Sequence, residues 1–474
     1  MADNYDLVVL GAGPGGYVAA IRAAQLGMKT AVVEKERVGG VCLHQGCIPS
    51  KSLLRSAELY HEMRQSEDYG IRVGEVQLEM DLVQGRKNRV KDQLHKGIQQ
   101  LLHKNGVTVI EGTGRILGPS IFSPMPGTIS VEKADGSEAE MLVPEHVIIA
   151  TGSHPRSLPG LEVDGEYVMF SDHALEMESL PRSMVIVGGG VIGVEWASML
   201  SDFGVEVTVV EFADRILPFE DADVSREMAR LLKKRKVKVL TGAKVLSESV
   251  RVEEGRVAYQ VDKGGEKLPL DAERMLVSVG REPNTEDIGL SNTSIQLEKG
   301  CIQVNPFMQT TESHIYAIGD VIGGYQLAHV ASHEGILAVE HLAGHSPHPL
   351  DPTLVPRCTY SRPEVGSIGL SEKEAKEKGY DVKVGKFPFR GVGKSLVLGE
   401  SDGFIKLVAD QKTEDILGVH IIGPHATDLI SEAGLAKVLD ATPWEITQVI
   451  HPHPTLSEVY GEVSTALEGL PIHF

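Results

Sequence analysis

The sequence predicts an α/β protein with two Rossmann-like dinucleotide-binding domains followed by a C-terminal α+β domain. Two glycine-rich fingerprints begin at Gly11 and Gly188, each between an apolar strand pattern and a helical pattern. A glutamate, Glu34 or Glu211, follows 23 residues after the first glycine of each fingerprint. The chain from about residue 346 onward has no such loop and mixes strand and helix patterns. These three observations are typical of two nucleotide-binding units and one further domain.

Composition limits the classes of function open to the chain. It has 474 residues, 42% of them hydrophobic and 24% charged, and a formal net charge of −20. This length allows about two to four domains. The acidic balance argues against nucleic acid or an anionic membrane surface as a partner. We expect neither of these partners, and no metal site.

The cysteine count and the N-terminus indicate a compartment. Four cysteines in a chain of this length do not form the disulfide framework of a small secreted protein. Tyr5–Leu10 already has a core-strand pattern, with no basic and apolar signal segment before it. No apolar run reaches the roughly 18 residues of a membrane helix. We therefore expect a cytoplasmic protein.

The first fingerprint follows the strand Tyr5–Leu10 and opens a helix over Tyr17–Leu26. Its glycines allow a tight turn and close approach of a pyrophosphate to the helix N-terminus. Val32-Val33-Glu34 forms the second strand, whose acid is placed for a ribose hydroxyl. The alternative is a glycine-rich turn that binds no ligand. The glycines of this fingerprint are Gly11, Gly13 and Gly16.

The segment Gly39–Lys51 holds two cysteines, Cys42 and Cys47, five positions apart. On a regular helix this spacing puts the Cα atoms about 8–9 Å apart, whereas a disulfide requires about 4.4–6.8 Å. A disulfide here therefore requires a distorted backbone, for which Gly46 supplies freedom. Pro49 suits the first turn of a helix. The alternatives are two buried cysteines or a metal site, and the absence of a Cys/His cluster nearby argues against structural zinc.

The middle of the chain contains a helical region, a group of strands and the boundary between the first two predicted domains. Residues 51–104 have helical apolar spacing, and strands with turn signals follow over 107–147. The apolar run Val147–Ala150 ends at Thr151-Gly152-Ser153. We expect a first domain at 1–149 to which 275–345 returns, a second at 150–274, and an interface domain at 346–474.

The second fingerprint repeats the first. The strand Met184–Val187 leads into a glycine loop and a helix that continues through Leu200, and the strand Val205–Glu211 follows. Glu211 favours NAD, because a carboxylate would repel the 2′-phosphate of NADP. We interpret Arg215, four residues further on, as a surface charge. The glycines of this fingerprint are Gly188, Gly190 and Gly193.

The C-terminal region contains His451-Pro-His453-Pro-Thr455-Leu-Ser-Glu458. The pair Thr455 and Glu458 has capping-box spacing, in which case the two His-Pro pairs form only a rigid helix entry. The second interpretation makes His453 a general base that Glu458 orients. The spacing leaves both open.

Taken together, these motifs resemble the pyridine nucleotide–disulfide oxidoreductases over essentially the whole chain. The resemblance rests on both fingerprints, the segment Gly39–Lys51 and four further motifs. The further motifs are Ala150-Thr-Gly152, Gly280-Arg281-Glu-Pro-Asn284, Tyr316-Ala-Ile-Gly319-Asp320 and His453-Pro-Thr455-x-x-Glu458.

The resemblance implies FAD at the first fingerprint and NAD at the second. It assigns to FAD the glycines of the first fingerprint together with Glu34, Lys51, Gly114 and Asp320. It assigns to NAD the glycines of the second fingerprint together with Glu211. It pairs Glu195 with Lys51, although Glu195 also suits a helix N-terminus. Further cofactor-binding positions implied in this way are Thr151, Gly152, Ala328, Val245, Gly280 and Arg281.

The resemblance also implies an activity. A dihydrolipoamide dithiol would reduce a Cys42–Cys47 disulfide, with His453 accepting the proton and Glu458 stabilising the imidazolium, and the electrons would reach NAD⁺ through FAD. It implies a homodimer in which one subunit's C-terminal domain completes the partner's active site. It further implies binding to the lipoyl domains of the E2 component of a 2-oxo acid dehydrogenase complex. Residues 188–217 and 451–458 are most similar to versions that serve branched-chain complexes.

Three residues depart from the family pattern. Val41 replaces a threonine, and His44 and Gln45 replace asparagine and valine between the cysteines. His44 is either a titratable group that shifts the thiol pKa or a plain loop histidine. The alternatives are a glutathione reductase, a mercuric reductase, or a flavoprotein with a binding role only. Glu211 argues against a glutathione reductase, and the lack of a cysteine pair after Cys358 argues against a mercuric reductase.

Overall fold

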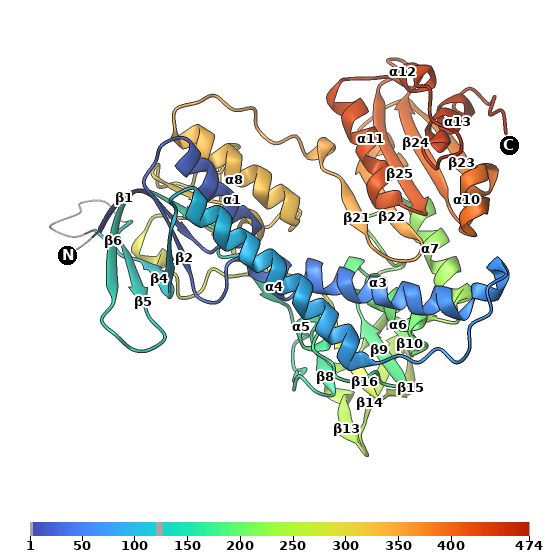
Figure 1. Ribbon diagram of the computed structural model, residues 1–474, viewed down its shortest axis with the longest axis horizontal. Helices are drawn as coiled ribbons and strands as arrows, with labels where there is room; N and C mark the ends of the chain where they lie inside the picture. Colours follow the sequence, from blue (N-terminus) through green and yellow to red (C-terminus); the bar gives the residue numbers. More distant parts are fainter. Residues whose placement is uncertain (1–2, 120–126, 474) are drawn as a thin grey trace. The chain divides into compact units, whose positions relative to one another are not determined.

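A computed structural model describes residues 3–119 and 127–473 (Figure 1). The chain forms two compact units, each built from three separate stretches of sequence. Unit 1 consists of residues 1–52, 81–156 and 281–350, and unit 2 of residues 53–80, 157–280 and 351–474.

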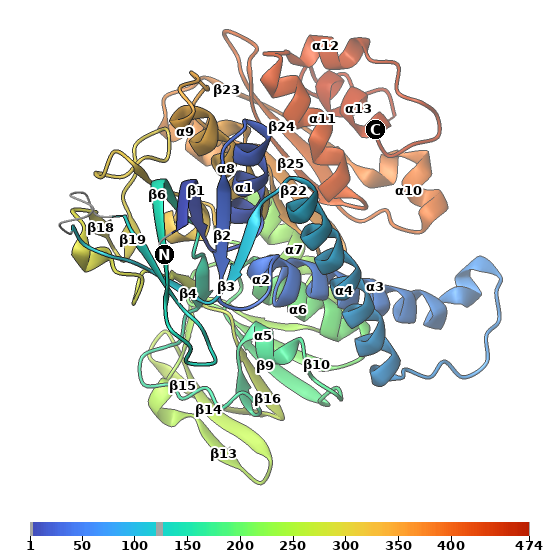
Figure 2. The same ribbon diagram turned by 60° about the vertical axis from the view of Figure 1, so that its left-hand side comes forward.

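Unit 1 contains a parallel sheet with strand order β3-β2-β1-β6, and β20 lies beside β6. Every residue of β2 is buried, as a strand covered on both faces requires. The helices α1 and α8 pack against each other, which both views show (Figures 1 and 2). The bounds are β1 Asp3–Leu10, β2 Thr30–Glu34, β3 Thr108–Glu111, β6 Glu140–Ile149, β20 Ile315–Ala317, α1 Pro14–Gln25 and α8 Ala328–Leu342.

The remainder of unit 1 extends this sheet and carries the cysteine segment. The strands β5 and β4 continue the sheet in antiparallel sense beyond β6. Short antiparallel pairs join β7 to β17 and β18 to β19. The bounds are α2 Gly40–His44, α3 Cys47–Arg64, α4 Met80–Lys104, β4 Thr113–Ile116, β5 Ile129–Glu132, β7 Ser153–Pro155, β17 Arg281–Pro283, η3 Leu290–Asn292, β18 Leu297–Glu298, β19 Cys301–Ile302 and η4 Gly319–Ile322.

Unit 2 contains a second parallel sheet, with strand order β11-β10-β9-β16-β8. Its first four strands repeat the arrangement β3-β2-β1-β6 of unit 1, because in both sheets the strand before the glycine loop lies between its successor and a returning strand. The structure thus confirms two Rossmann-like folds. The bounds are β8 Val168–Met169, α5 Ser171–Ala174, β9 Ser183–Val187, α6 Val191–Asp202, β10 Glu206–Val210, α7 Ala222–Lys234, β11 Lys238–Leu240 and β16 Arg274–Val277.

An antiparallel group, β12-β14-β13 with β15 beside β14, interrupts this second sheet in the sequence. Tyr259 of β14 lies in the core that the group shares with the parallel sheet. The bounds are β12 Ala243–Val245, η2 Ser247–Ser249, β13 Arg251–Glu253, β14 Arg256–Lys263 and β15 Glu266–Ala272.

The C-terminal part of unit 2 is an antiparallel sheet with order β21-β22-β25-β24-β23. Phe387, Phe389 and Tyr460 are fully buried in its core, as the α+β prediction requires. The bounds are η5 Pro352–Leu354, β21 Arg357–Thr359, β22 Glu364–Gly369, α9 Glu372–Glu377, β23 Val382–Pro388, η6 Phe389–Gly391, α10 Gly393–Leu398, β24 Phe404–Asp410, β25 Ile416–Gly423, α11 Ala426–Val438, α12 Pro443–Gln448 and α13 Glu458–Ala466.

The structure tests two predictions of secondary structure. The helical region predicted over 51–104 is wrong at residues 71–79, which have no regular structure between η1 (Ser66–Tyr69) and α4. The physical reason is Gly70, whose left-handed φ of 75° ends the preceding turn. The strands predicted over 107–147 are present as β3 to β6, except that residues 120–126 lie outside the described residues. In the described ranges no helix has the length and apolar character that a membrane crossing needs.

The C-terminal sheet allows a test of its packing. A Cβ at Gly418 in β25 would lie 2.1 Å from the carbonyl oxygen of Leu370, so Gly418→Ala should lower the free energy of unfolding by about 1–3 kcal/mol. Gly434 lies inside α11, where a Cβ would meet only Ile368 at 3.6 Å. Gly434→Ala should therefore raise stability by about 0.5–1 kcal/mol. Urea unfolding of both variants checks this, and equal midpoints would contradict it.

Candidate functional site

The first glycine loop is tight at two glycines and open at the third. A Cβ at Gly11, whose φ is +98°, would lie 2.4 Å from the Ala150 carbonyl oxygen, and one at Gly16 would lie 1.9 Å from the Gly11 oxygen. Gly13 has no atom within 4 Å of its Cβ position. The backbone is therefore held close to the sheet while open space lies at the N-terminus of α1. This arrangement fits a pyrophosphate.

The acids that follow both fingerprints hold their own glycine loops. Glu34 accepts hydrogen bonds from the amides of Ala12 at 2.7 Å and Glu36 at 2.9 Å. Glu211 accepts from Gly189 at 2.5 Å and Ala213 at 2.7 Å. The sequence pointed to ribose as the partner of these carboxylates and did not reveal this second role. Each acid fixes the residue after the first glycine.

The cysteine segment begins directly against the first glycine loop. The amide of Gly39 donates to the Ala12 carbonyl at 2.8 Å. A Cβ at Gly40 would lie 2.6 Å from the Gly13 Cα. Gly39 and Gly40 have φ values of 110° and 60°, in the left-handed region that glycine tolerates. Backbone contact thus fixes the start of α2 relative to the loop.

The two cysteines lie on different helices. Cys42 is in α2, which ends at His44, and Cys47 begins α3, so the backbone between them departs from one regular helix as the sequence predicted. Gly46 contributes by close approach, because a Cβ there would lie 3.1 Å from the Val41 oxygen. Pro49 occupies the first turn of α3.

Cys42 and Cys47 are thiols in direct contact. The hydrogen bond with Cys47 and burial raise the pKa of the Cys42 thiol, and the charge of Lys51 acts in the opposite sense. Tyr17 of α1 lies close enough that burial and the charge of Cys42 raise its pKa. Two sulfurs, a lysine and a tyrosine therefore form one electrostatic cluster beside the glycine loop.

His44 is held away from the thiols by its own hydrogen bond. Its Nε2 contacts the Val38 carbonyl at 2.9 Å, and Nδ1 of His95 in α4 contacts the same oxygen at 3.0 Å. The two rings meet edge to face with centroids 5.3 Å apart. Burial lowers the pKa of His44, and the charge of Arg37 lowers it further. His44 and His95 therefore help to tie the cysteine segment to α4.

Three of the motifs that the sequence singled out meet in unit 1. Ser153 donates to Asp320 at 2.5 Å, and Arg281 donates to the Ser153 hydroxyl and carbonyl at 2.7 Å each. Arg281 and Asp320 also form an ion pair at 3.8 Å. Thr151 and Asn284 exchange hydrogen bonds at 2.7 and 2.8 Å. Thr151 and Gly152 thus lie beside Arg281 and Asp320, at the end of β6.

Glu334 is a residue of this cluster that sequence reasoning missed. It lies in α8, is buried, and accepts a hydrogen bond from the Gly319 amide at 2.7 Å. Burial, together with the negative charge of Asp320, raises the pKa of Glu334 to about 7. A glutamate six residues into a helix after a glycine-rich turn gives no motif, so the sequence offered no signal for it.

The second glycine loop has the geometry of the first. Gly188 has φ +108°, and a Cβ at Gly193 would lie 1.9 Å from the Gly188 oxygen, whereas Gly190 has open space. Glu195, in the second turn of α6, accepts from the Tyr360 amide at 2.9 Å. Its predicted pairing with Lys51 stays a prediction. The loop fits a second dinucleotide.

Four other residues that the sequence analysis predicted to bind a cofactor lie in different environments. Val245 is buried in the core of unit 2, so its side chain packs and only its backbone can meet a ligand. Gly114 lies in β4 and packs closely against the end of β1, because a Cβ at Gly114 would lie 2.7 Å from Leu10 Cδ2. Ala328 is the first residue of α8. Gly280 has a left-handed φ of 117° directly before Arg281.

At the C-terminus Glu458 contacts both residues that the two interpretations assigned to it. Its Oε2 accepts from the Thr455 amide at 2.9 Å, and its Oε1 contacts His453 Nδ1 at 2.8 Å. The full capping box is not formed, because Thr455 Oγ1 donates to the Pro452 carbonyl and α13 begins only at Glu458. Burial raises the pKa of Glu458, but the bonds from His453 and Thr455 outweigh it and lower the pKa. His453 is largely exposed, with Nε2 left to take a proton.

Comparison with known proteins gives the family. Residues 5–335 match the model of the pyridine nucleotide-disulphide oxidoreductases, and residues 355–464 match that family's dimerisation domain. The chain belongs to the pyridine nucleotide-disulphide oxidoreductase family. This confirms the resemblance and the α/β fold with a C-terminal dimerisation domain.

Relatives within this family cover the whole chain. The chain is 64% identical to a dihydrolipoyl dehydrogenase of Bacillus subtilis and 43% identical to one of Zymomonas mobilis, over 100% of both chains in each case. The crystal structure of LpdA from Mycobacterium tuberculosis superposes with a TM-score of 0.90 at 28% identity, covering 98% of this chain and 100% of that one.

Membership of the pyridine nucleotide-disulphide oxidoreductases defines the class of chemistry. The chain is an oxidoreductase with FAD and NAD as cofactors. The match to the dimerisation domain supports a homodimer.

The raised pKa of Glu334 predicts a pH effect on stability. The folded protein binds this proton more tightly than the unfolded chain, whose glutamates titrate near pH 4–5. The stabilisation is therefore complete below about pH 4 and is lost as the pH rises through about 7. The loss is roughly 3 kcal/mol at most.

Glu334→Gln should remove this dependence while keeping an acceptor for the Gly319 amide. Thermal unfolding of both proteins from pH 5 to pH 8 should show the wild-type midpoint falling relative to that of the variant. Parallel curves would contradict the assignment.

Proposed function

We propose that the protein oxidises protein-bound dihydrolipoamide to lipoamide and reduces NAD⁺ to NADH, as the E3 subunit of a 2-oxo acid dehydrogenase complex. The observation that carries this proposal is the contact between Cys42 and Cys47 on a segment that packs against the first glycine loop. The 64% identical relative with the name dihydrolipoyl dehydrogenase supports it. The Cys42–Cys47 pair cycles between disulfide and dithiol.

The sulfur chemistry balances without a further reagent. A thiolate of dihydrolipoamide attacks Cys42 Sγ of the disulfide, the Cys42–Cys47 bond breaks, and Cys47 leaves as a thiolate. The second substrate sulfur then attacks the sulfur bound to Cys42, which forms lipoamide and releases the Cys42 thiolate. The substrate loses two electrons and two protons, and the cysteine pair gains both electrons. The hydrogen bond with Cys47 and burial raise the pKa of Cys42, and the positive charge of Lys51 opposes this rise and so acts in favour of the thiolate.

The first glycine loop, Glu34, Lys51 and Asp320 are the residues that we propose to hold FAD. When bound, FAD supplies the two-electron carrier that links the cysteine pair to NAD⁺. The second glycine loop and Glu211 would hold NAD⁺. The carboxylate of Glu211 disfavours NADP⁺, because a 2′-phosphate would approach a negative charge.

His453 of the partner subunit is the proposed proton acceptor. Its Nδ1 faces Glu458 at 2.8 Å, so Nε2 takes the substrate proton and the carboxylate stabilises the imidazolium that forms. His451 is unsuited to this role, since its side chain is 8% exposed and its Nε2 already contacts Glu432 at 2.8 Å.

The remaining assignments follow from the same proposal. We assign residues 1–149 and 275–345 to FAD binding, 150–274 to NAD binding and 346–474 to dimerisation. The partners are the lipoyl domains of the E2 component, and the similarity at 188–217 and 451–458 favours a branched-chain complex. A cysteine pair that must be reduced in each cycle suits the reducing conditions of the cytoplasm.

Cys42→Ser tests the role of the cysteine pair. The variant should keep its flavin, because no glycine-loop contact changes, and lose at least about a thousandfold in turnover of dihydrolipoamide with NAD⁺. Cys301→Ser, which changes a cysteine of β19, is the matched control and should retain activity. Turnover in Cys42→Ser comparable to that of the control would refute the dithiol role.

His453→Gln tests the proton acceptor. Removing it should lower turnover by about a hundredfold or more. His425→Gln is the control, since His425 also lies beside a carboxylate and is well exposed. A near-normal rate in His453→Gln would return His453 to a purely structural role before α13.

A further inference from the structure

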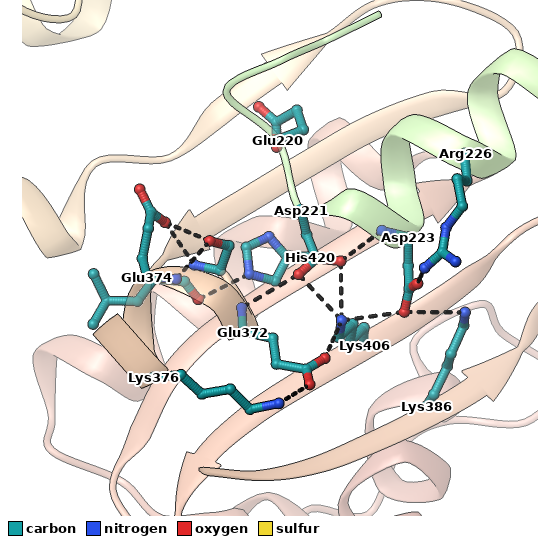
Figure 3. Close-up of polar contacts among 12 residues, drawn as sticks. Glu220, Asp221, Asp223, Arg226, Glu372, Glu374, Lys376, Lys386, Lys406 and His420 are labelled. Atoms are coloured by element: carbon teal, nitrogen blue, oxygen red, sulfur yellow. Dashed lines mark hydrogen bonds and ion pairs between the residues drawn. The ribbon is translucent and has the colours of Figure 1, made fainter. Parts of the chain in front are cut away.

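A row of polar side chains crosses the whole C-terminal sheet of unit 2. Directly paired residues on its five strands join Arg357 to Ser367, Ser367 to His420, His420 to Lys406, and Lys406 to Lys386. Residues paired in this way share one face of a sheet. These five residues are called the polar row, and Figure 3 shows three of them.

Three acids next to the start of α7 face the polar row. Lys406 Nζ contacts both oxygens of Asp221 at 3.0 and 3.1 Å and Asp223 at 3.1 Å (Figure 3). Ser367 donates to Glu220, and Arg357 contacts the same carboxylate at 3.4 Å. Glu372 of α9 adds a further carboxylate at 2.8 Å from Lys406.

This cluster lies in the interior of unit 2. The side chains of Lys406, Asp221 and Glu220 are 3%, 2% and 5% exposed. Burial would raise the pKa of Asp223, but the hydrogen bond and charge of Lys406 outweigh it and lower the pKa. Buried charges are costly unless each is paired, and removal of one partner leaves the others uncompensated. The polar row therefore determines where residues 220–223 lie.

The chain just before these acids holds the second glycine loop. Residues 211–221, called the connecting segment, begin at Glu211, which binds the Gly189 amide, and Leu217 donates its own amide to the Gly189 carbonyl at 2.8 Å. A Cβ at Gly189 would lie 2.7 Å from Ile216 Cγ2. Both polar groups of the Gly189 backbone are thus bound by the connecting segment.

The connecting segment is held in one conformation rather than relaxed. Leu217 has a φ of 46°, which is rare for a bulky residue and persists only where surrounding contacts impose it. Ser225 of α7 donates to the Leu217 carbonyl at 3.0 Å. Arg215, interpreted from the sequence as a surface charge, instead donates to the carbonyls of Pro218 and Glu220 at 2.7 and 3.3 Å. The segment links Gly189 to the polar row over a few residues.

We propose that the polar row is a positioning device for the NAD⁺ loop, with Lys406 as its central positioning residue. Lys406 and Ser367 fix the acids at one end of the connecting segment, and the segment fixes Gly189 at its other end. The inference rests on the proposed function, because it takes the second glycine loop as the NAD⁺ site. Disturbing the row should therefore weaken NAD⁺ binding without altering the reaction of the cysteine pair.

Lys406→Met tests the proposal in the FAD-loaded enzyme. The Kd for NAD⁺, measured calorimetrically with the oxidised enzyme, should rise about three- to thirtyfold, and the KM for NAD⁺ should rise with it. Reduction of the flavin by excess dihydrolipoamide without NAD⁺ should keep its rate within about twofold. Lys383→Met is the matched control, because Lys383 lies on β23 and pairs with Glu468, outside the polar row. It should leave both quantities unchanged.

Ser367→Ala keeps the experiment decisive if Lys406→Met does not fold. It removes only the hydroxyl that binds Glu220 and should raise the Kd for NAD⁺ by about twofold to tenfold, again without changing flavin reduction. A Kd equal to that of the wild type in the folded variants, or an equal rise in Lys383→Met, would overturn the inference. Absence of NAD⁺ binding or of reduction by dihydrolipoamide in the wild-type enzyme would instead overturn the proposed function.

Discussion

The contact between Gly40 and Gly13 is the constraint on which the catalytic arrangement depends. At this point two backbones approach so closely that a single Cβ would lie 2.6 Å from the opposite Cα, and the Gly39 amide bonds to Ala12 beside it. The cysteine segment is therefore placed by main-chain contact with the first glycine loop. A side-chain contact could adjust by rotamer changes, whereas this one cannot. The proposed redox pair and the proposed FAD loop are thus held in a fixed relation by backbone contacts.

The same arrangement of a carboxylate and a glycine loop occurs twice in the chain. In both Rossmann-like folds a glutamate at the end of the second strand, or directly after it, bonds to the amide that follows the first glycine. The carboxylate thus fixes the conformation of the loop. The two glycine loops differ in the segments that contact them. The cysteine segment contacts the first loop, and the connecting segment, which ends at acids that face the polar row, contacts the second.

The sequence predicted the fold class, both fingerprints and the family, because these depend on local patterns with a physical meaning at fixed spacing. It failed at residues 71–79, where Gly70 ends a turn in a stretch that otherwise has helical composition. It also did not reveal Glu334 or the polar row. Glu334 contacts a backbone amide from another element, and the polar row joins five strands, so both arise from tertiary pairing and leave no periodic signal. His453 and Glu458 were found by spacing, but only the structure showed that one carboxylate serves both the histidine and the Thr455 amide.

The account depends on a Cys42–Cys47 disulfide that is reduced and formed again in each cycle, while the other cysteines keep their oxidation state. The most direct measurement is thiol alkylation and peptide mass mapping of the FAD-loaded protein after equilibration with lipoamide or with dihydrolipoamide. The chain has four cysteines. The account predicts that the peptide with Cys42 and Cys47 takes up two labels after dihydrolipoamide and none after lipoamide, while Cys301 and Cys358 label equally in both. Equal labelling of Cys42 and Cys47 under the two conditions would contradict it.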